Sequence, residues 1–103
     1  MTLFVISWMD RPDSFALRAA TRDAHFAHIA RHVDKVRLGG PFIDEEGRMI
    51  GSMIVFEADT LEEAQAFHES DPYALAGLFE QSTIMPWRAT VGALPARAHA
   101  AKV

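Results

Sequence analysis

Three histidines lie close together in the first third of the chain, at His25, His28 and His32. If this segment is helical, spacings of three and seven residues place the three side chains within an arc of about 60° on one face. Such an arrangement suggests a metal site. A closed site, however, needs further ligands from another element, and the sequence contains no His-Glu-x-x-His pattern. We therefore predict no metal site, and we expect His28 and His32 to face solvent.

His25 differs from the other two because it lies at the border of the apolar face that this helix is expected to have. Arg18 and Arg22 lie on the same side of the helix, toward its N-terminus. A partly buried cation needs an anion, which either the fold or a ligand supplies. The candidate carboxylate is Asp71, which belongs to the later segment Glu-Ser-Asp-Pro-Tyr.

Each of these features also has a plainer explanation. The arginines can reach water over their apolar stems, with His25 as a residue at the boundary of the core. An aspartate before a proline commonly starts a turn, which accounts for Asp71 without any partner. Spacing alone does not decide between the two interpretations.

Length and composition restrict the class of protein. The chain has 103 residues, of which 50% are hydrophobic and 23% are charged, and these values are typical of one globular domain. A formal net charge of −4 argues against nucleic acid as a partner. The absence of cysteine excludes disulfides and thiolate chemistry. The apolar start of the chain is too short to span a membrane and lacks a basic leader, so we expect a cytoplasmic protein without membrane contact.

Hydrophobic patterning predicts the elements that position the candidate residues. Strands are expected over residues 3–9, 36–42, 49–57 and 78–91. A first helix is expected from position 13 or 14 to about 33. A second should begin after Thr60, because Glu63 follows at capping-box spacing. The residues that the first helix should turn toward the core are Phe15, Ala19, Phe26, Ile29, Ala30 and Val33.

The resulting order, β-α-β-β-α-β, is that of a ferredoxin-like α+β fold with a four-stranded antiparallel sheet. Two helices can cover only one face of such a sheet. The first strand is nevertheless apolar on both faces, because Leu3, Val5 and Met9 alternate with Phe4, Ile6 and Trp8. We therefore expect a homodimer that packs sheet to sheet. Such dimers could also assemble into a larger ring. The domain should span residues 1–92, and residues 93–103 should form a loose tail.

Four segments of the chain together resemble the YciI family, whose domain is named YCII-related. They are Arg-Asp-Ala-His (22–25), Leu-Gly-Gly-Pro-Phe (38–42), the run 51–80 that contains Asp-Pro-Tyr, and Ile-Met-Pro-Trp (84–87). The resemblance implies the dimeric α+β barrel superfamily. It also implies that His25 and Asp71 meet in a cleft as the family's proposed catalytic dyad. One branch of the family is similar to dehydrochlorinases of chlorinated hydroxyquinols, and muconolactone isomerases share the superfamily.

The chemistry of such a pair follows from its two groups. A carboxylate that accepts from one ring nitrogen fixes the imidazole tautomer and leaves the other nitrogen as an acid or base. We therefore predict a lyase or isomerase without a cofactor, acting on a small oxygenated compound, with cyclic and aromatic compounds as candidates. Arg18 or Arg22 would hold a substrate carboxylate or oxyanion. Ser52 could face the same cleft. Tyr73 and Phe79 could line it, although core packing is the simpler explanation for Phe79.

Other functions remain open at this point. In a non-catalytic module that binds a small ligand or a partner, His25 and Asp71 would be a structural pair, since a fold does not determine function. Dimeric α+β barrels also include oxygenases without a cofactor, and the chain could be a subunit of a larger complex. The sequence has no Rossmann or P-loop motif, so a nucleotide cofactor is not expected.

Overall fold

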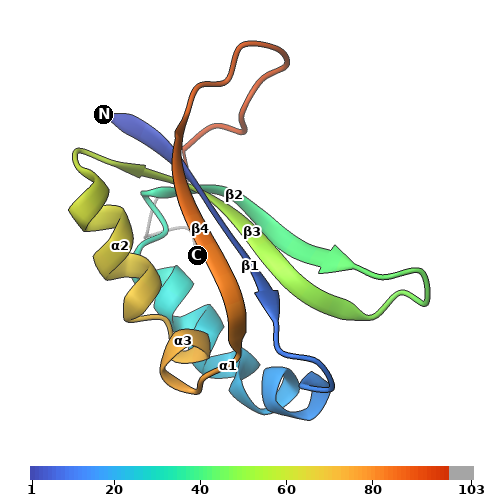
Figure 1. Cartoon of the computed structure of the whole chain (residues 1–103). Coiled ribbons are helices and arrows are strands. Elements are labelled where there is room, and N and C mark those ends of the chain that lie inside the picture. Colours follow the sequence, from blue (N-terminus) through green and yellow to red (C-terminus); the bar gives the residue numbers. More distant parts are fainter. Residues whose placement is uncertain (98–103) are drawn as a thin grey trace.

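The computed structural model describes residues 1–97 and shows one antiparallel sheet with all helices on the same face (Figure 1). The elements are β1 (Thr2–Asp10), α1 (Phe15–Arg31), β2 (Val36–Ile43), β3 (Met49–Ala58), α2 (Leu61–Glu69), α3 (Pro72–Leu75) and β4 (Phe79–Trp87). The four strands are ordered β2-β3-β1-β4. The predicted ferredoxin-like α+β fold is therefore confirmed. The short helix α3 was not predicted, and β4 ends earlier than expected.

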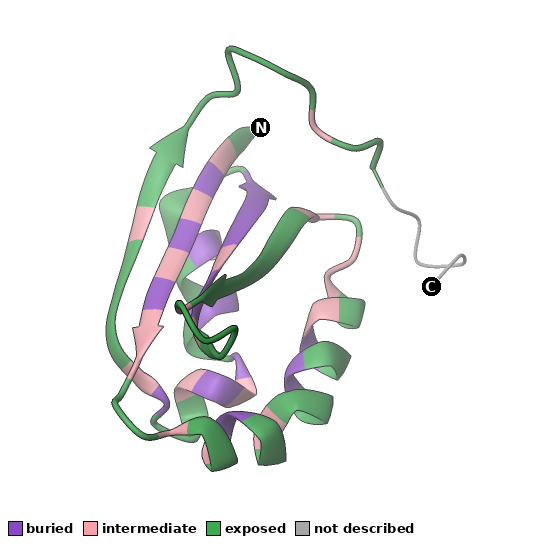
Figure 2. Ribbon diagram, turned by 90° about the vertical axis from the view of Figure 1, so that its right-hand side faces the viewer, coloured by how far each residue is buried: buried purple, intermediate pink, exposed green. Residues whose placement is uncertain are grey.

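The core lies between the helices and the inner face of the sheet. Burial alternates along β1, where Phe4, Ile6 and Trp8 point inward (Figure 2). Thr60 caps α2 as predicted, since its hydroxyl accepts from the backbone N–H of Glu63 at 3.2 Å. The buried residues that complete this cluster are Ile54, Phe56, Ala58, Ala64, Phe67, Tyr73 and Leu78. Within residues 1–97, no helix has the length and apolar character needed to cross a membrane.

The inward face of α1 differs from the predicted one. Its buried residues are Arg18, His25 and His28, whereas Phe15 is 39% exposed and Phe26 is 58% exposed. Ala19 and Ala30, which were also expected inside, are exposed. The prediction was wrong because apolar periodicity assigns the inward face of a helix only from the positions of its apolar residues. Here α1 borders a cavity and turns polar groups inward that find partners on other elements.

His28 also departs from the prediction that it faces solvent. It is only 2% exposed, and its Nε2–H donates to the carbonyl of Phe67 at 2.9 Å. Its ring stacks on that of Phe67, with 4.7 Å between the ring centroids. His32 is half-buried against the same phenylalanine, and burial lowers the pKa of its imidazole. These two histidines therefore join α1 to α2.

The segment after β4 contacts the rest of the fold near its end, through Pro95 and Arg97. The looseness expected of residues 93–103 stays a prediction. Arg97 donates to both carboxylate oxygens of Glu57 at 2.7 and 2.8 Å, and to the backbone carbonyl of Asp34 at 2.9 Å. Arg37 also donates to Glu57, at 3.0 Å. The hydrogen bond from Arg97 is the main cause that holds the pKa of the Glu57 carboxyl below its usual value. Residues 98–103 of the predicted tail lie outside the described residues.

Candidate active site

The structure brings His25 and Asp71 into contact. Nδ1 of His25 on α1 lies 2.9 Å from both carboxylate oxygens of Asp71, and the side chains are 9% and 1% exposed. Because a carboxylate only accepts, Nδ1 carries a proton and Nε2 of the neutral ring is unprotonated. Nε2 is therefore the nitrogen that is able to take up a proton.

Local sequence explains how Asp71 is fixed in place. Asp71 is the N-cap of α3, and Pro72 follows at the first helical position, where its missing N–H costs nothing. Oδ1 of Asp71 accepts from the backbone N–H of Tyr73 at 2.9 Å. The carboxylate therefore has two roles, because it caps α3 and also orients His25.

Tyr73 lies between His25 and Arg18. Its ring stacks on His25 with 4.1 Å between centroids and 18° between the planes. The guanidinium carbon of Arg18 lies 5.0 Å from the centroid of the Tyr73 ring. Burial raises the pKa of the Tyr73 phenol, so this group stays protonated. Tyr73 can thus position the imidazole and donate a hydrogen bond, but it is a poor base.

Asp10 holds Arg18 in a buried network that the sequence analysis missed. Nε of Arg18 donates to Asp10 at 2.7 Å, and one terminal nitrogen donates to Asp10 and to the Ser52 hydroxyl, both at 3.1 Å. Trp8 Nε1–H also donates to Asp10, at 3.1 Å. The charge of Arg18 is therefore compensated by the fold. Asp10 at the end of β1, eight residues before Arg18, was the only hint in the sequence.

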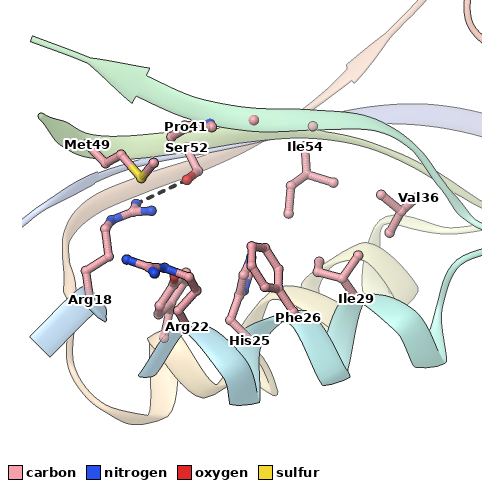
Figure 3. Close-up of a pocket in the computed structure, with 13 residues that line it drawn as sticks. Arg18, Arg22, His25, Phe26, Ile29, Val36, Pro41, Met49, Ser52 and Ile54 are labelled. Carbon is pink, nitrogen blue, oxygen red and sulfur yellow. Dashed lines mark hydrogen bonds between the residues drawn. The ribbon is translucent and has the colours of Figure 1, made fainter. Parts of the chain in front are cut away.

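A cavity of about 420 Å³ lies between α1 and the strands β2 and β3. The predicted residues Arg18, Arg22, His25, Ser52 and Tyr73 all line it. In Figure 3 the ends of Arg18 and Arg22 lie on one side of the cavity, near Ser52 and Met49. The apolar side chains on the other side are those of Ile29, Val36 and Ile54. The remaining lining residues, which the sequence analysis did not assign to a site, are Phe26, Gly39, Gly40 and Pro41.

Phe79 does not line this cavity but lies in the core, which was the simpler explanation for it. Its ring packs in the core against Trp8, with 4.6 Å between centroids, and against His68, with 4.8 Å. Asp71 lies behind His25 and supports it without lining the cavity. In the part of the chain that the structure describes, no group of three or more His, Asp or Glu side chains is placed to hold a metal ion.

The family model of the YCII-related domain matches residues 2–88. The chain belongs to the YCII-related family. It is 34% identical over 94 residues to protein YciI of Escherichia coli O6:H1, an alignment that covers 84% of this chain and 96% of that protein.

Two solved structures of other proteins have a similar fold. The 5-chloro-2-hydroxyhydroquinone dehydrochlorinase of Burkholderia phenoliruptrix, in complex with 2,5-dihydroxybenzoquinone, is 32% identical with a TM-score of 0.80. The alignment covers 85% of this chain and 95% of the dehydrochlorinase. A NIPSNAP family protein of Agrobacterium tumefaciens is 13% identical with a TM-score of 0.56, covering 86% and 92% of the two chains. That second likeness shows the fold alone.

Next to the candidate site, this YCII-related protein buries a further histidine. His68 on α2 is 6% exposed, and its Nε2 has no hydrogen-bond partner among the described residues. Its ring stacks on Phe79 and lies 5.6 Å from Trp8, between centroids. Burial is the main cause that lowers the pKa of the His68 imidazole from 6.5, although the Asp71 carboxylate opposes this effect.

Replacing His68 by phenylalanine should reduce the acid sensitivity of the fold. Below pH 6.5, His68 takes up a proton more readily in the unfolded chain than in the folded protein. The free energy of unfolding therefore decreases as the pH is lowered. Phenylalanine keeps the stack on Phe79 but cannot be protonated. Melting temperatures from about pH 7.5 to about pH 5 should fall less in His68→Phe than in the wild type, with His32 causing part of the remaining fall. An unchanged pH profile would contradict this assignment.

Proposed function

We propose that this protein is a lyase or isomerase without a cofactor that moves a proton on a small oxygenated cyclic compound. The observation that carries the proposal is the buried His25–Asp71 pair at the wall of a 420 Å³ cavity. The dehydrochlorinase with a bound quinone, at 32% identity, supports a small-molecule enzyme. A cavity of this size suits a single ring with a few substituents.

In the proposed mechanism, Nε2 of His25 takes a proton from a substrate hydroxyl or from a carbon next to a carbonyl. The Asp71 carboxylate stabilises the imidazolium that forms. In an isomerisation, the imidazolium returns the proton to another atom of the substrate. In an elimination, the leaving group departs as an anion with its bonding electrons. Tyr73 keeps the imidazole plane in place throughout.

The test is a screen of turnover on small lactones and on chlorinated hydroquinones, followed by absorbance and by chloride release. On any active compound, His25→Gln should lower turnover at least about a hundredfold, because it removes the acid–base group. The matched control is His32→Gln, at the residue that follows α1, which should retain activity because His32 does not line the cavity. Equal turnover by His25→Gln and the wild type would contradict the mechanism.

A second candidate function is a non-catalytic module that binds a small ligand. The observation in its favour is that Asp71 also caps α3, so the pair has a structural role in any case. In that case no compound would be turned over. Replacing His25 would then change stability and ligand affinity only.

We also propose that two copies pair through the outer face of the sheet. The pairing of strands places Val5 beside Met85 and Leu3 beside Trp87 on this face. Large apolar side chains remain open on it, including Met85 at 61% exposed and Trp87 at 42%. An uncovered apolar face of this kind is typical of an interface.

Replacing Met85 by glutamate should therefore prevent pairing, because it would bury a charge on each side of the interface. Sedimentation should give twice the chain mass for the wild type and the chain mass for Met85→Glu. The control is Leu75→Glu, since Leu75 is 76% exposed on α3, on the helix side of the sheet. A wild-type protein of single-chain mass would refute the proposed dimer.

A further inference from the structure

We propose that the compound bound in the cavity is a carboxylic acid and that Arg22 binds its carboxylate. The inference rests on the proposed function for placing the substrate beside His25, and it adds the chemical class of that substrate. It also assigns different roles to Arg18 and Arg22, for which the sequence predicts the same role.

The cavity has a cationic end and an apolar end. Figure 3 shows the guanidinium ends of Arg18 and Arg22 on one side of His25 and the side chains of Ile29 and Val36 on the other. A ligand that fills the cavity must therefore present a polar or anionic group at one end and an apolar body at the other. The reacting part of such a ligand would lie near His25, between the two ends.

Only one of the arginines at the cationic end lacks an anion among residues 1–97. Arg18 is bound to Asp10 at 2.7 Å. Arg22, whose side chain is exposed, forms no ion pair or side-chain hydrogen bond in that part of the chain, and it lines the cavity. A guanidinium beside an apolar cavity gains most from a carboxylate, which it can bind through two parallel hydrogen bonds. One uncompensated positive charge also matches a carboxylate better than a doubly charged phosphate.

A second hollow of about 370 Å³ continues from the cationic end. It shares Arg18, Arg22 and Met49 with the main cavity and adds Phe15 and Arg48. The guanidinium carbon of Arg48 lies 5.0 Å from the centroid of the Phe15 ring. This hollow leaves room for a carboxylate that projects beyond the ring-sized part of the cavity.

Arg48 should contribute less than Arg22. Its guanidinium already contacts Asp44 at 2.9 Å and Glu46 at 3.2 Å, and its side chain is 51% exposed. Exposed ion pairs of this kind are weak and screened by salt. We therefore assign Arg22 as the main anchor and Arg48 as a weaker one on the β2–β3 turn.

The test compares acids with their amides, which have the same shape but no charge. The probes are benzoate with benzamide and 2,5-dihydroxybenzoate with 2,5-dihydroxybenzamide, titrated by calorimetry and by NMR. The wild type should bind each acid about tenfold or more tightly than its amide. Arg22→Gln should weaken acid binding about tenfold to a hundredfold and leave amide binding unchanged. Arg48→Gln should weaken acid binding about two- to fivefold.

The matched control is Arg31→Gln, which removes the same charge from an exposed position at the end of α1, outside the cavity. It should keep the wild-type preference, which excludes a general effect of net charge. Equal affinity for acid and amide, no measurable binding of either acid, or a preference that survives Arg22→Gln would overturn the inference.

The outcome is separable from that of the proposed function. Repeating the titrations with His25→Gln should leave the acid preference in place, because binding of the carboxylate does not need the base. Turnover that depends on His25 without an acid preference would refute only the carboxylate inference. An acid preference that depends on Arg22, without any turnover, would refute only the enzyme.

Discussion

Asp71→Asn is expected to slow turnover about a thousandfold while the protein stays folded. Oδ1 of Asp71 accepts from the N–H of Tyr73, and in the variant the amide oxygen can keep this bond. The amide NH₂ then faces Nδ1 of His25, which must become an acceptor. The ring proton moves to Nε2 as a result, so the nitrogen that faces the substrate is no longer a base.

Two measurements check this expectation. Nitrogen-15 NMR should show the proton of neutral His25 on Nδ1 in the wild type and on Nε2 in Asp71→Asn. Turnover on an active compound from the screen should fall in parallel. A variant that keeps the Nδ1–H tautomer, or more than about a tenth of the activity, would favour a structural pair.

Asp71→Ala provides the contrast for stability. It removes the cap of α3 and the partner of His25 together, so a backbone N–H and an imidazole N–H lose their acceptor. The free energy of unfolding should fall by about 2–4 kcal/mol, as measured by urea denaturation. Asp71→Asn should cost clearly less, because both sites keep a polar neighbour.

Gly51→Ala is expected to cause a large loss of stability, of about 2–4 kcal/mol in the free energy of unfolding. Gly51 lies in β3 opposite Met9 of β1. A Cβ at this position would overlap the backbone carbonyl oxygen of Trp8 and lie 3.1 Å from both the Met9 sulfur and the Phe42 ring. A paired backbone cannot move away without breaking the ladder between β1 and β3.

Gly40→Ala is the matched control, because a Cβ at Gly40 meets nothing within 4 Å. Its effect on urea denaturation should stay within about 0.5 kcal/mol. Ser52 follows Gly51 directly and contacts Arg18, so the Gly51 variant should also disturb the wall of the cavity. Equal stability of the two variants would show that the strands adjust to an added methyl group without cost.

The sequence predicts the sheet and its inner face well. Apolar alternation in residues 3–9 indicates which side chains enter the core, and Phe4, Ile6 and Trp8 do so. The capping pattern at Thr60 likewise predicts the start of α2. Both signals are reliable because they depend on geometry within a few residues. Helix α3 is missed because a single turn is too short to show periodicity.

Residue types made Asp71 a candidate partner of His25, but only the family resemblance favoured that pairing over the plainer explanations. The two residues are 46 positions apart, and no local pattern relates them. The inward face of α1 was predicted wrongly for a related reason. His25, Arg18 and His28 are buried because Asp71, Asp10 and the carbonyl of Phe67 compensate them, and these partners come from three other parts of the chain.

By itself, the sequence determined the order of the elements, the inner face of the sheet and the set of residue types available for chemistry. Periodicity and capping are local, so a linear pattern records them. Only the tertiary structure decided that Asp10 compensates Arg18 while Arg22 lacks a partner within residues 1–97, and that Phe79 belongs to the core. Ion pairs and cavity walls depend on the packing of distant elements to within about an ångström, which no spacing along the chain encodes.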